Sequence, residues 1–224
     1  QGTTIFSFSS ALQPRWRRHL AGLRGGDLAV ADGLLFHENS DEVLSTANGS
    51  TRVTLPAPFG LGVIGDGVAV MATAGGTTLR TLQTSTLLPG PTHSLNGAQS
   101  KAPLAVATWQ SPWGPRDVAL VFTEQTNSRR LEAIELQTGA AAFACELELP
   151  ELPLMSAVTP GAVTVMLGGY PAYVGWPRCD DCDPRYARTR SRFLTLPLPG
   201  LTPSSSAPWS GGWGNEGHTH REGR

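Results

Sequence analysis

Residues 28–36 read Leu-Ala-Val-Ala-Asp-Gly-Leu-Leu-Phe, which is two short apolar segments joined by Asp32-Gly33. Asp-Gly tolerates the positive φ angles that a two-residue turn between antiparallel strands requires, so the stretch predicts a β-hairpin. Residues 61–70 repeat the pattern as Leu-Gly-Val-Ile-Gly-Asp-Gly-Val-Ala-Val. Two looser copies run from 104 to 122 through Pro115 and Asp117, and from 155 to 165 through Pro160-Gly161.

The spacing of these hairpins indicates a repeat. Their tips are predicted near residues 32, 66, 117 and 160, so they are about 34, 51 and 43 residues apart. A second pair of segments follows, at 79–82 and 86–88 in the second copy and at 131–136 and 141–145 in the third. Four strands every ~35–50 residues is the period of β-propeller blades, which stack because one blade cannot bury both its faces. We therefore expect an all-β propeller of about four recognisable blades over 1–201, with a further strand at 3–9 and a polar tail over 202–224.

One copy resembles a known repeat. Residues 131–139 read Leu-Glu-Ala-Ile-Glu-Leu-Gln-Thr-Gly and lead into Ala-Ala-Ala-Phe-Ala at 140–144. This resembles the repeat of bacterial quinoprotein-like (PQQ-like) β-propellers, and the hairpins at 28–36 and 61–70 look like the segment that precedes it. Propellers of that family usually have roughly seven or eight blades. The resemblance implies either the C-terminal portion of a larger propeller, which we expect, or a small complete one.

The balance of charged residues and the lack of long apolar runs exclude some classes of function. The 17 Lys and Arg residues balance the 18 Asp and Glu residues, which argues against a nucleic-acid binder because such proteins carry a basic footprint. No apolar run approaches the ~18 residues of a membrane span. No secretory signal follows Gln1, from which we expect a cleaved or trimmed product.

Three cysteines are present, and two of them form the motif Cys179-Asp-Asp-Cys182. Asp183 stands where a haem attachment motif would need His, and a zinc site would need two more ligands. A loop disulfide is the main interpretation, with free thiols and a bound metal as alternatives. A disulfide would imply an oxidising compartment, in keeping with an exported protein. Cys145 closes an apolar run, so we expect it to be buried.

Other polar residues have ordinary interpretations beside functional ones. Asp180, Asp181 and Asp183 could bind Ca²⁺ but lack EF-hand spacing, and His218 with His220 could form part of a metal clip. A local basic run is either a solvated rim or a docking patch for an acidic partner; its members are Arg185, Arg188, Arg190 and Arg192. Trp209 and Trp213 are the candidate anchors of the tail.

No nucleophile or cofactor motif is complete, and we predict no catalytic residue, cofactor or metal. We expect a non-catalytic propeller scaffold or protein-interaction module of an exported or cell-envelope assembly. Its predicted partner is another protein chain or the N-terminal part of the same precursor, across more than ~1,000 Å². The alternative is a ligand-binding or enzymatic quinoprotein-like propeller whose site is completed by missing blades. Analysis of the purified protein for quinone, metal or sugar would discriminate between them.

Overall fold

The computed structural model describes residues 2–23, 28–56, 58, 60, 62–73, 76–95, 98–99, 105–125, 128–147, 152–168 and 192–205. Within these ranges the chain forms strands β1 to β19 and no helix, which confirms the all-β prediction. A membrane-spanning helix is accordingly not found among these residues.

Two four-stranded antiparallel meanders follow each other. The first unit comprises β3 (Leu28–Ala31), β4 (Leu34–His37), β5 (Glu42–Ser45) and β6 (Thr51–Thr54); the second comprises β7 (Val63–Gly65), β8 (Val68–Ala72), β9 (Thr78–Gln83) and β10 (Pro89–Ser94). Asp32 and Gly33 have φ angles of 52° and 74°, and Asp66 and Gly67 have 49° and 69°. Both Asp-Gly pairs therefore form the predicted hairpin turns.

Two further sheets complete the row. The third unit comprises β12 (Ala105–Ser111), β13 (Gly114–Gln125), β14 (Ser128–Glu135) and β15 (Ala141–Leu147), and it is extended by β11 (Ala98–Gln99) on β13 and by β19 (Leu201–Pro203) on β12. The fourth unit has β16 (Leu152–Thr159), β17 (Ala162–Gly168) and β18 (Arg192–Pro197). Before all of these stands a hairpin of β1 (Gly2–Phe8) and β2 (Pro14–Ala21).

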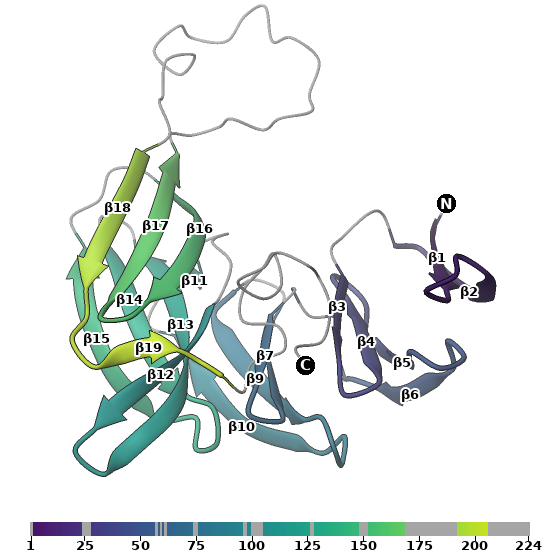
Figure 1. Ribbon diagram of the computed structural model, residues 1–224, viewed down its shortest axis with the longest axis horizontal. Coiled ribbons are helices and arrows are strands. Elements are labelled where there is room, and N and C mark those ends of the chain that lie inside the picture. The colour runs from purple at the N-terminus through teal and green to yellow at the C-terminus, as the bar shows by residue number, and fades with distance from the viewer. Residues whose placement is uncertain are drawn as a thin grey trace, which may run out of the picture.

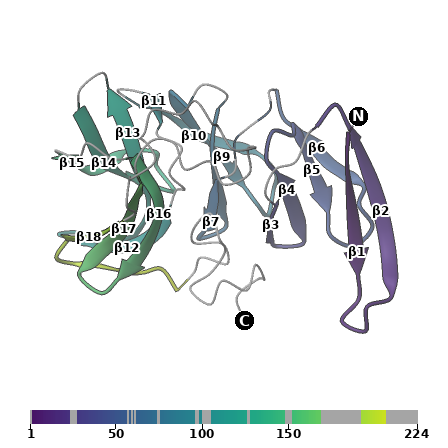
Figure 2. The same cartoon turned by 90° about the horizontal axis from the view of Figure 1, so that it is seen from above.

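The units are arranged as an open row. The β1–β2 hairpin lies at one end, the first and second units follow, and the third and fourth units lie at the other end (Figures 1 and 2). Strand β12 contacts both β7 and β16, so the first strands of the second, third and fourth units are neighbours. This is the arrangement of blades around a common axis.

The core lies between the units, because successive residues of a strand point to opposite faces. In the first unit, Leu35 and Leu44 pack against the β1–β2 hairpin, whereas Phe36 and Val43 pack against the second unit. Leu136 lies between the second and third units, and Leu131 lies between the third and fourth. Both side chains are fully buried. Each such side chain contributes about 1.5–3 kcal/mol when fully buried. The contact between units is therefore what stabilises the row.

The turns between the third and fourth strands confirm the repeat. The backbone N–H of Gly49 donates to Ser45 O at 2.9 Å, that of Leu87 to Gln83 O at 2.8 Å, and that of Gly139 to Glu135 O at 2.9 Å. Residues 49, 87 and 139 have φ angles of 70°, 60° and 70°. The same backbone turn thus occurs in three successive units.

Two predicted boundaries are wrong. The third hairpin turns between Ser111 and Gly114, not at Asp117, which lies within β13 and pairs with Thr108. Gly114, with a φ of 106°, supplies the positive angle that the turn needs, and Pro115 is tolerated because it lies in β13 before the pairing with β14 begins at Val118. Residues 86–88 lie in the connection between β9 and β10, and the strand itself, β10, starts at Pro89. Its prolines are accommodated because β10 is the outermost strand of its sheet.

Candidate interaction surfaces

Most of the residues singled out from the sequence lie outside the described residues. These are Cys179, Cys182, Arg185, Arg188, Arg190, Trp209 and Trp213, together with the aspartates at 180, 181 and 183 and the histidines at 218 and 220. Arg192 is the first residue of β18, where only its backbone is described. The loop disulfide, the basic docking patch and the tail anchors therefore stay predictions.

Trp16 joins the β1–β2 hairpin to the first unit. Its indole Nε1–H donates to the carbonyl of Thr46 at 2.8 Å, and its ring lies over Gly49 in the turn that follows β5. A Cβ atom on Gly49 would lie 2.6 Å from Trp16 Cε3. Only a glycine at this position lets the ring approach so closely. Asn48-Gly49 is a recognisable turn sequence, but nothing local to it indicates the contact with Trp16.

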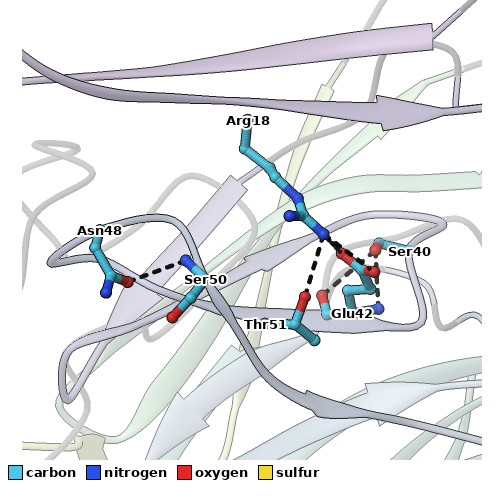
Figure 3. A network of polar contacts seen from close by, with 6 residues as sticks. All are labelled: Arg18, Ser40, Glu42, Asn48, Ser50 and Thr51. Atoms are coloured by element: carbon cyan, nitrogen blue, oxygen red, sulfur yellow. Dashed lines mark hydrogen bonds and ion pairs between the residues drawn. The ribbon is translucent and has the colours of Figure 1, made fainter.

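Arg18 adds a polar link at the same junction. Its guanidinium donates to both carboxylate oxygens of Glu42, at 3.4 and 3.0 Å, and to the hydroxyl of Thr51 at 3.2 Å (Figure 3). The Ser40 hydroxyl accepts from the backbone N–H of Glu42, and Asn48 Oδ1 accepts from the N–H of Ser50. The Arg18–Glu42 pair is partly exposed, so it contributes on the order of 1 kcal/mol or less. Its main effect is to orient the hairpin on the first unit.

The aspartates of the hairpin turns also join units. Asp32 accepts a hydrogen bond of 2.5 Å from the hydroxyl of Thr84 in the second unit. Asp66 accepts one of 2.9 Å from the side-chain amide of Gln137 in the third unit. Each aspartate therefore has two roles, since it adopts the turn conformation and contacts the next unit. At this edge, Asp32 and Asp66 therefore serve as structural links between units.

Glu132 is the one acidic side chain with almost no exposure among the described residues, at 3%. Its carboxylate accepts a hydrogen bond of 3.2 Å from the Thr123 hydroxyl and lies 3.8 Å from His93 Nε2 and 3.9 Å from a terminal nitrogen of Arg130. His93 Nδ1 in turn lies 3.0 Å from the carbonyl of Gly139. The gap beside this cluster is about 10 Å³, which is the size of one water molecule. The cluster joins the second and third units and leaves no room for a substrate.

Cys145 is half-buried on β15 and is a free cysteine. The prediction of a buried thiol was too strong, because β15 is the outermost strand of its sheet and covers the core with one face only. Partial burial is the largest cause that raises the pKa of this thiol. In the described part of the chain no three His, Cys, Asp or Glu side chains gather as metal ligands would.

Large apolar side chains are exposed at both ends of the row. On β1, Ile5 faces the first unit, whereas Phe6 and Phe8 point the other way and are 59% and 53% exposed. On β18, Leu194 and Leu196 pack inward and Phe193 points outward with 75% exposure. We call these surfaces the β1 end face and the β18 end face. Inside the row, the equivalent faces are covered by a neighbouring unit.

Several solved structures share this fold, among them the two that follow, while no family model and no curated protein matches the sequence. BamB from Moraxella catarrhalis superposes with a TM-score of 0.53 at 16% identity, over 88% of this chain and 56% of that chain. Kuenenia stuttgartiensis hydrazine synthase superposes with a TM-score of 0.54 at 13% identity, over 92% of this chain and 62% of that chain. Both are β-propeller proteins, and this chain has the β-propeller fold. It spans less than two thirds of either matched chain.

Proposed function

We propose that this chain is a non-catalytic β-propeller scaffold that binds another protein chain through the end faces of its blades. The observation that carries the proposal is the exposure of Phe6, Phe8 and Phe193 where the repeat would place a further blade. Exposed apolar patches of this kind are typical of protein interaction sites. The partner is a separate polypeptide or the N-terminal part of the same precursor.

The β1 end face offers a strand edge as well as side chains. In the first three units of the row, the third strand pairs with a second strand on one side and a fourth on the other. Strand β1 occupies the place of a third strand, because β2 docks on the next unit through Trp16 as an outermost strand does. Among the described strands, β1 pairs with β2 alone. An unpaired edge of this kind favours addition of a strand from a partner.

The proposal also covers the type of repeat, the location of the protein and its C-terminal segment. We propose a quinoprotein-like repeat, an exported or cell-envelope location, and a polar tail over 202–224. The turn repeated at Gly49, Leu87 and Gly139 supports the repeat type. Strand β19 (Leu201–Pro203) pairs with β12, so the sheet extends slightly into the segment assigned to the tail. The location would be supported by an oxidised Cys179–Cys182 pair in protein isolated from its native host, measured by mass spectrometry before and after reduction.

The experiment that tests the interaction function is sedimentation analysis over a range of concentrations. We expect the wild-type chain to associate beyond its 23.7 kDa monomer, because its end faces are apolar. Replacement of Phe6, Phe8 and Phe193 by serine is expected to reduce this association. Leu88→Ser is the matched control, since Leu88 is 62% exposed but lies in the turn before β10, away from both end faces. A cooperatively folding monomer at all concentrations would contradict the proposal.

A further inference from the structure

A pocket of about 260 Å³ opens between the first and second units. One wall is the connection after β6, with Leu55, Pro56 and Pro58. The other wall is the face of the second unit formed by the end of β8, the middle of β9 and the start of β10. Pockets that hold drug-sized ligands measure roughly 300–1,000 Å³, so this one fits a group the size of a single ring with a small polar substituent.

The pocket exists because the outermost strand of the first unit is short. The β1–β2 hairpin covers the first unit with the eight residues of β2 and inserts Trp16 at the junction. Strand β6 has only four residues, and the chain leaves it at Leu55-Pro56. At the next junction Pro91 and His93 of β10 fill the space and leave a gap of about 10 Å³. This junction therefore lacks the large side chain that fills the junctions on either side of it.

Arg80 is the charged group of the pocket. Met71, Arg80 and Thr92 are cross-strand partners on β8, β9 and β10, so their side chains share the face toward the first unit. Arg80 is half-buried there, and within the described part of the chain its guanidinium forms no ion pair or side-chain hydrogen bond. The neighbouring positions that the structure does not describe, 57, 59, 61, 74 and 75, are Ala, Phe, Leu, Ala and Gly, none of which is acidic.

Two other polar side chains of the pocket, Thr73 and Thr81, already have partners. The Thr73 hydroxyl donates to the carbonyl of Thr78 at 3.1 Å, and the Thr81 hydroxyl donates to the carbonyl of Pro91 at 2.7 Å. Arg80 thus presents a fork of N–H donors beside an apolar cavity. A planar guanidinium of this kind binds carboxylates with two parallel hydrogen bonds.

We propose that this pocket binds the C-terminal residue of a partner polypeptide, with an aromatic side chain among Leu55, Pro58 and Leu82 and the terminal carboxylate on Arg80. Charge complementarity favours this occupant, because Arg80 is the only charged side chain among the described residues that line the pocket, and an internal peptide segment without an acidic side chain would leave it unpaired. The inference rests on the proposed interaction function and names a second contact for the partner, separate from the end faces.

The test uses N-acetyl-phenylalanine, which imitates a C-terminal residue, and N-acetyl-phenylalaninamide, which lacks the charge. We expect calorimetry to show saturable binding of the acid. The affinity for the amide should be lower by a factor of about ten or more, since a charge-assisted hydrogen bond contributes roughly 1.5–3 kcal/mol. Arg80→Gln is expected to reduce the affinity for the acid to that for the amide, and Arg80→Lys is expected to recover part of it. Arg52→Gln, at an exposed position on β6, is the matched control and should bind like the wild type.

Three results would overturn the inference. Equal binding of acid and amide by the wild-type protein would remove the role of the carboxylate. Equal binding of the acid by wild type and Arg80→Gln, with both folded by circular dichroism, would remove the role of Arg80. Binding of N-acetyl-phenylalanine without binding of the peptide acetyl-Ala-Ala-Ala-Ala-Phe would exclude a polypeptide terminus. None of these results would change the sedimentation of the wild-type chain, so failure here is distinct from failure of the end-face proposal.

Discussion

Replacement of Gly49 by alanine is expected to destabilise the protein more than replacement of Gly22, although both glycines have positive φ angles. These angles are +70° at Gly49 and +80° at Gly22. Alanine in the left-handed region costs about 1–2 kcal/mol, so the backbone contribution is similar at both positions. The surroundings differ, because a Cβ at position 22 meets no atom within 4 Å whereas one at position 49 lies 2.6 Å from the Trp16 ring.

The magnitude follows from this contact. Overpacking of a well-filled site costs about 1–3 kcal/mol, so Gly49→Ala should cost about 2–5 kcal/mol in total, against about 1–2 kcal/mol for Gly22→Ala. Trp16→Ala removes the ring and with it the steric conflict. In the Trp16→Ala background, Gly49→Ala is therefore expected to cost no more than Gly22→Ala does in the wild type. The coupling between positions 16 and 49 should be about 1–3 kcal/mol.

The assay is equilibrium urea unfolding followed by far-ultraviolet circular dichroism, a signal that comes mainly from the backbone. Five proteins are compared: wild type, the two single variants of positions 16 and 49, their double variant, and Gly22→Ala. Equal costs for Gly49→Ala in both backgrounds would show that the ring does not rest on this turn. The assignment of β2 as an outermost strand would then lose its main support.

Three further predictions concern single side chains. Thr123→Val should lower the free energy of unfolding by about 1.5–3 kcal/mol, because the buried Glu132 carboxylate loses the hydrogen bond from the Thr123 hydroxyl. A double-mutant cycle by urea unfolding should show a smaller loss in a Glu132→Leu background. Because burial raises the pKa of the Cys145 thiol, peptide mapping should find slower alkylation at Cys145 in the folded protein than in the unfolded chain at the same pH. The contribution of the protonated thiol to stability is present below the pKa of the unfolded chain and is lost as the pH rises through the pKa of the folded protein. Leu12→Gly should raise the midpoint of urea unfolding, since Leu12 has a φ of 58° and its side chain is 80% exposed. Leu87→Gly should bring no gain although Leu87 has a φ of 60°, because the Leu87 side chain packs against the core. Equal effects of the two substitutions would contradict this reasoning.

The hairpins of the first two units could be predicted because their turns depend on local chemistry. Asp32-Gly33 and Asp66-Gly67 both adopt the positive φ angles that their sequence favours. The third tip was misplaced because Pro115 and Asp117 are common turn residues in an average sequence, and here both lie in a long strand. Pro112 and Gly114 are turn residues of the same kind, so the pairing of Thr108 with Asp117 across the sheet decides between the alternatives.

The turn after the third strand was visible in one unit and hidden in another. Gly139 follows Thr138 in a recognisable Thr-Gly pair, while the same turn in the second unit has Leu87 at the positive-φ position. The turn persists because its closing hydrogen bond joins two backbone groups and does not need a particular side chain. Sequence similarity between units is therefore weaker than their structural similarity.

The interaction surfaces could be predicted only in part for a similar reason. Contacts such as Asp32 with Thr84 and Asp66 with Gln137 join residues far apart in the chain, so no local pattern marks them. The pocket around Arg80 depends on the shortness of β6, which the sequence between Thr54 and Pro58 suggests only through its prolines.

The sequence of β1 is that of a strand covered on both faces. A strand with one solvated face alternates apolar and polar residues, but β1 places Ile5 on one face and Phe6 and Phe8 on the other. Full burial of the two phenylalanines would contribute about 3–6 kcal/mol. Association itself costs about 4–15 kcal/mol in lost freedom of motion, so these side chains alone would give only weak binding. A partner that also adds a strand to the edge of β1 gains backbone hydrogen bonds, and this combination is what can make the β1 end face a stable binding site.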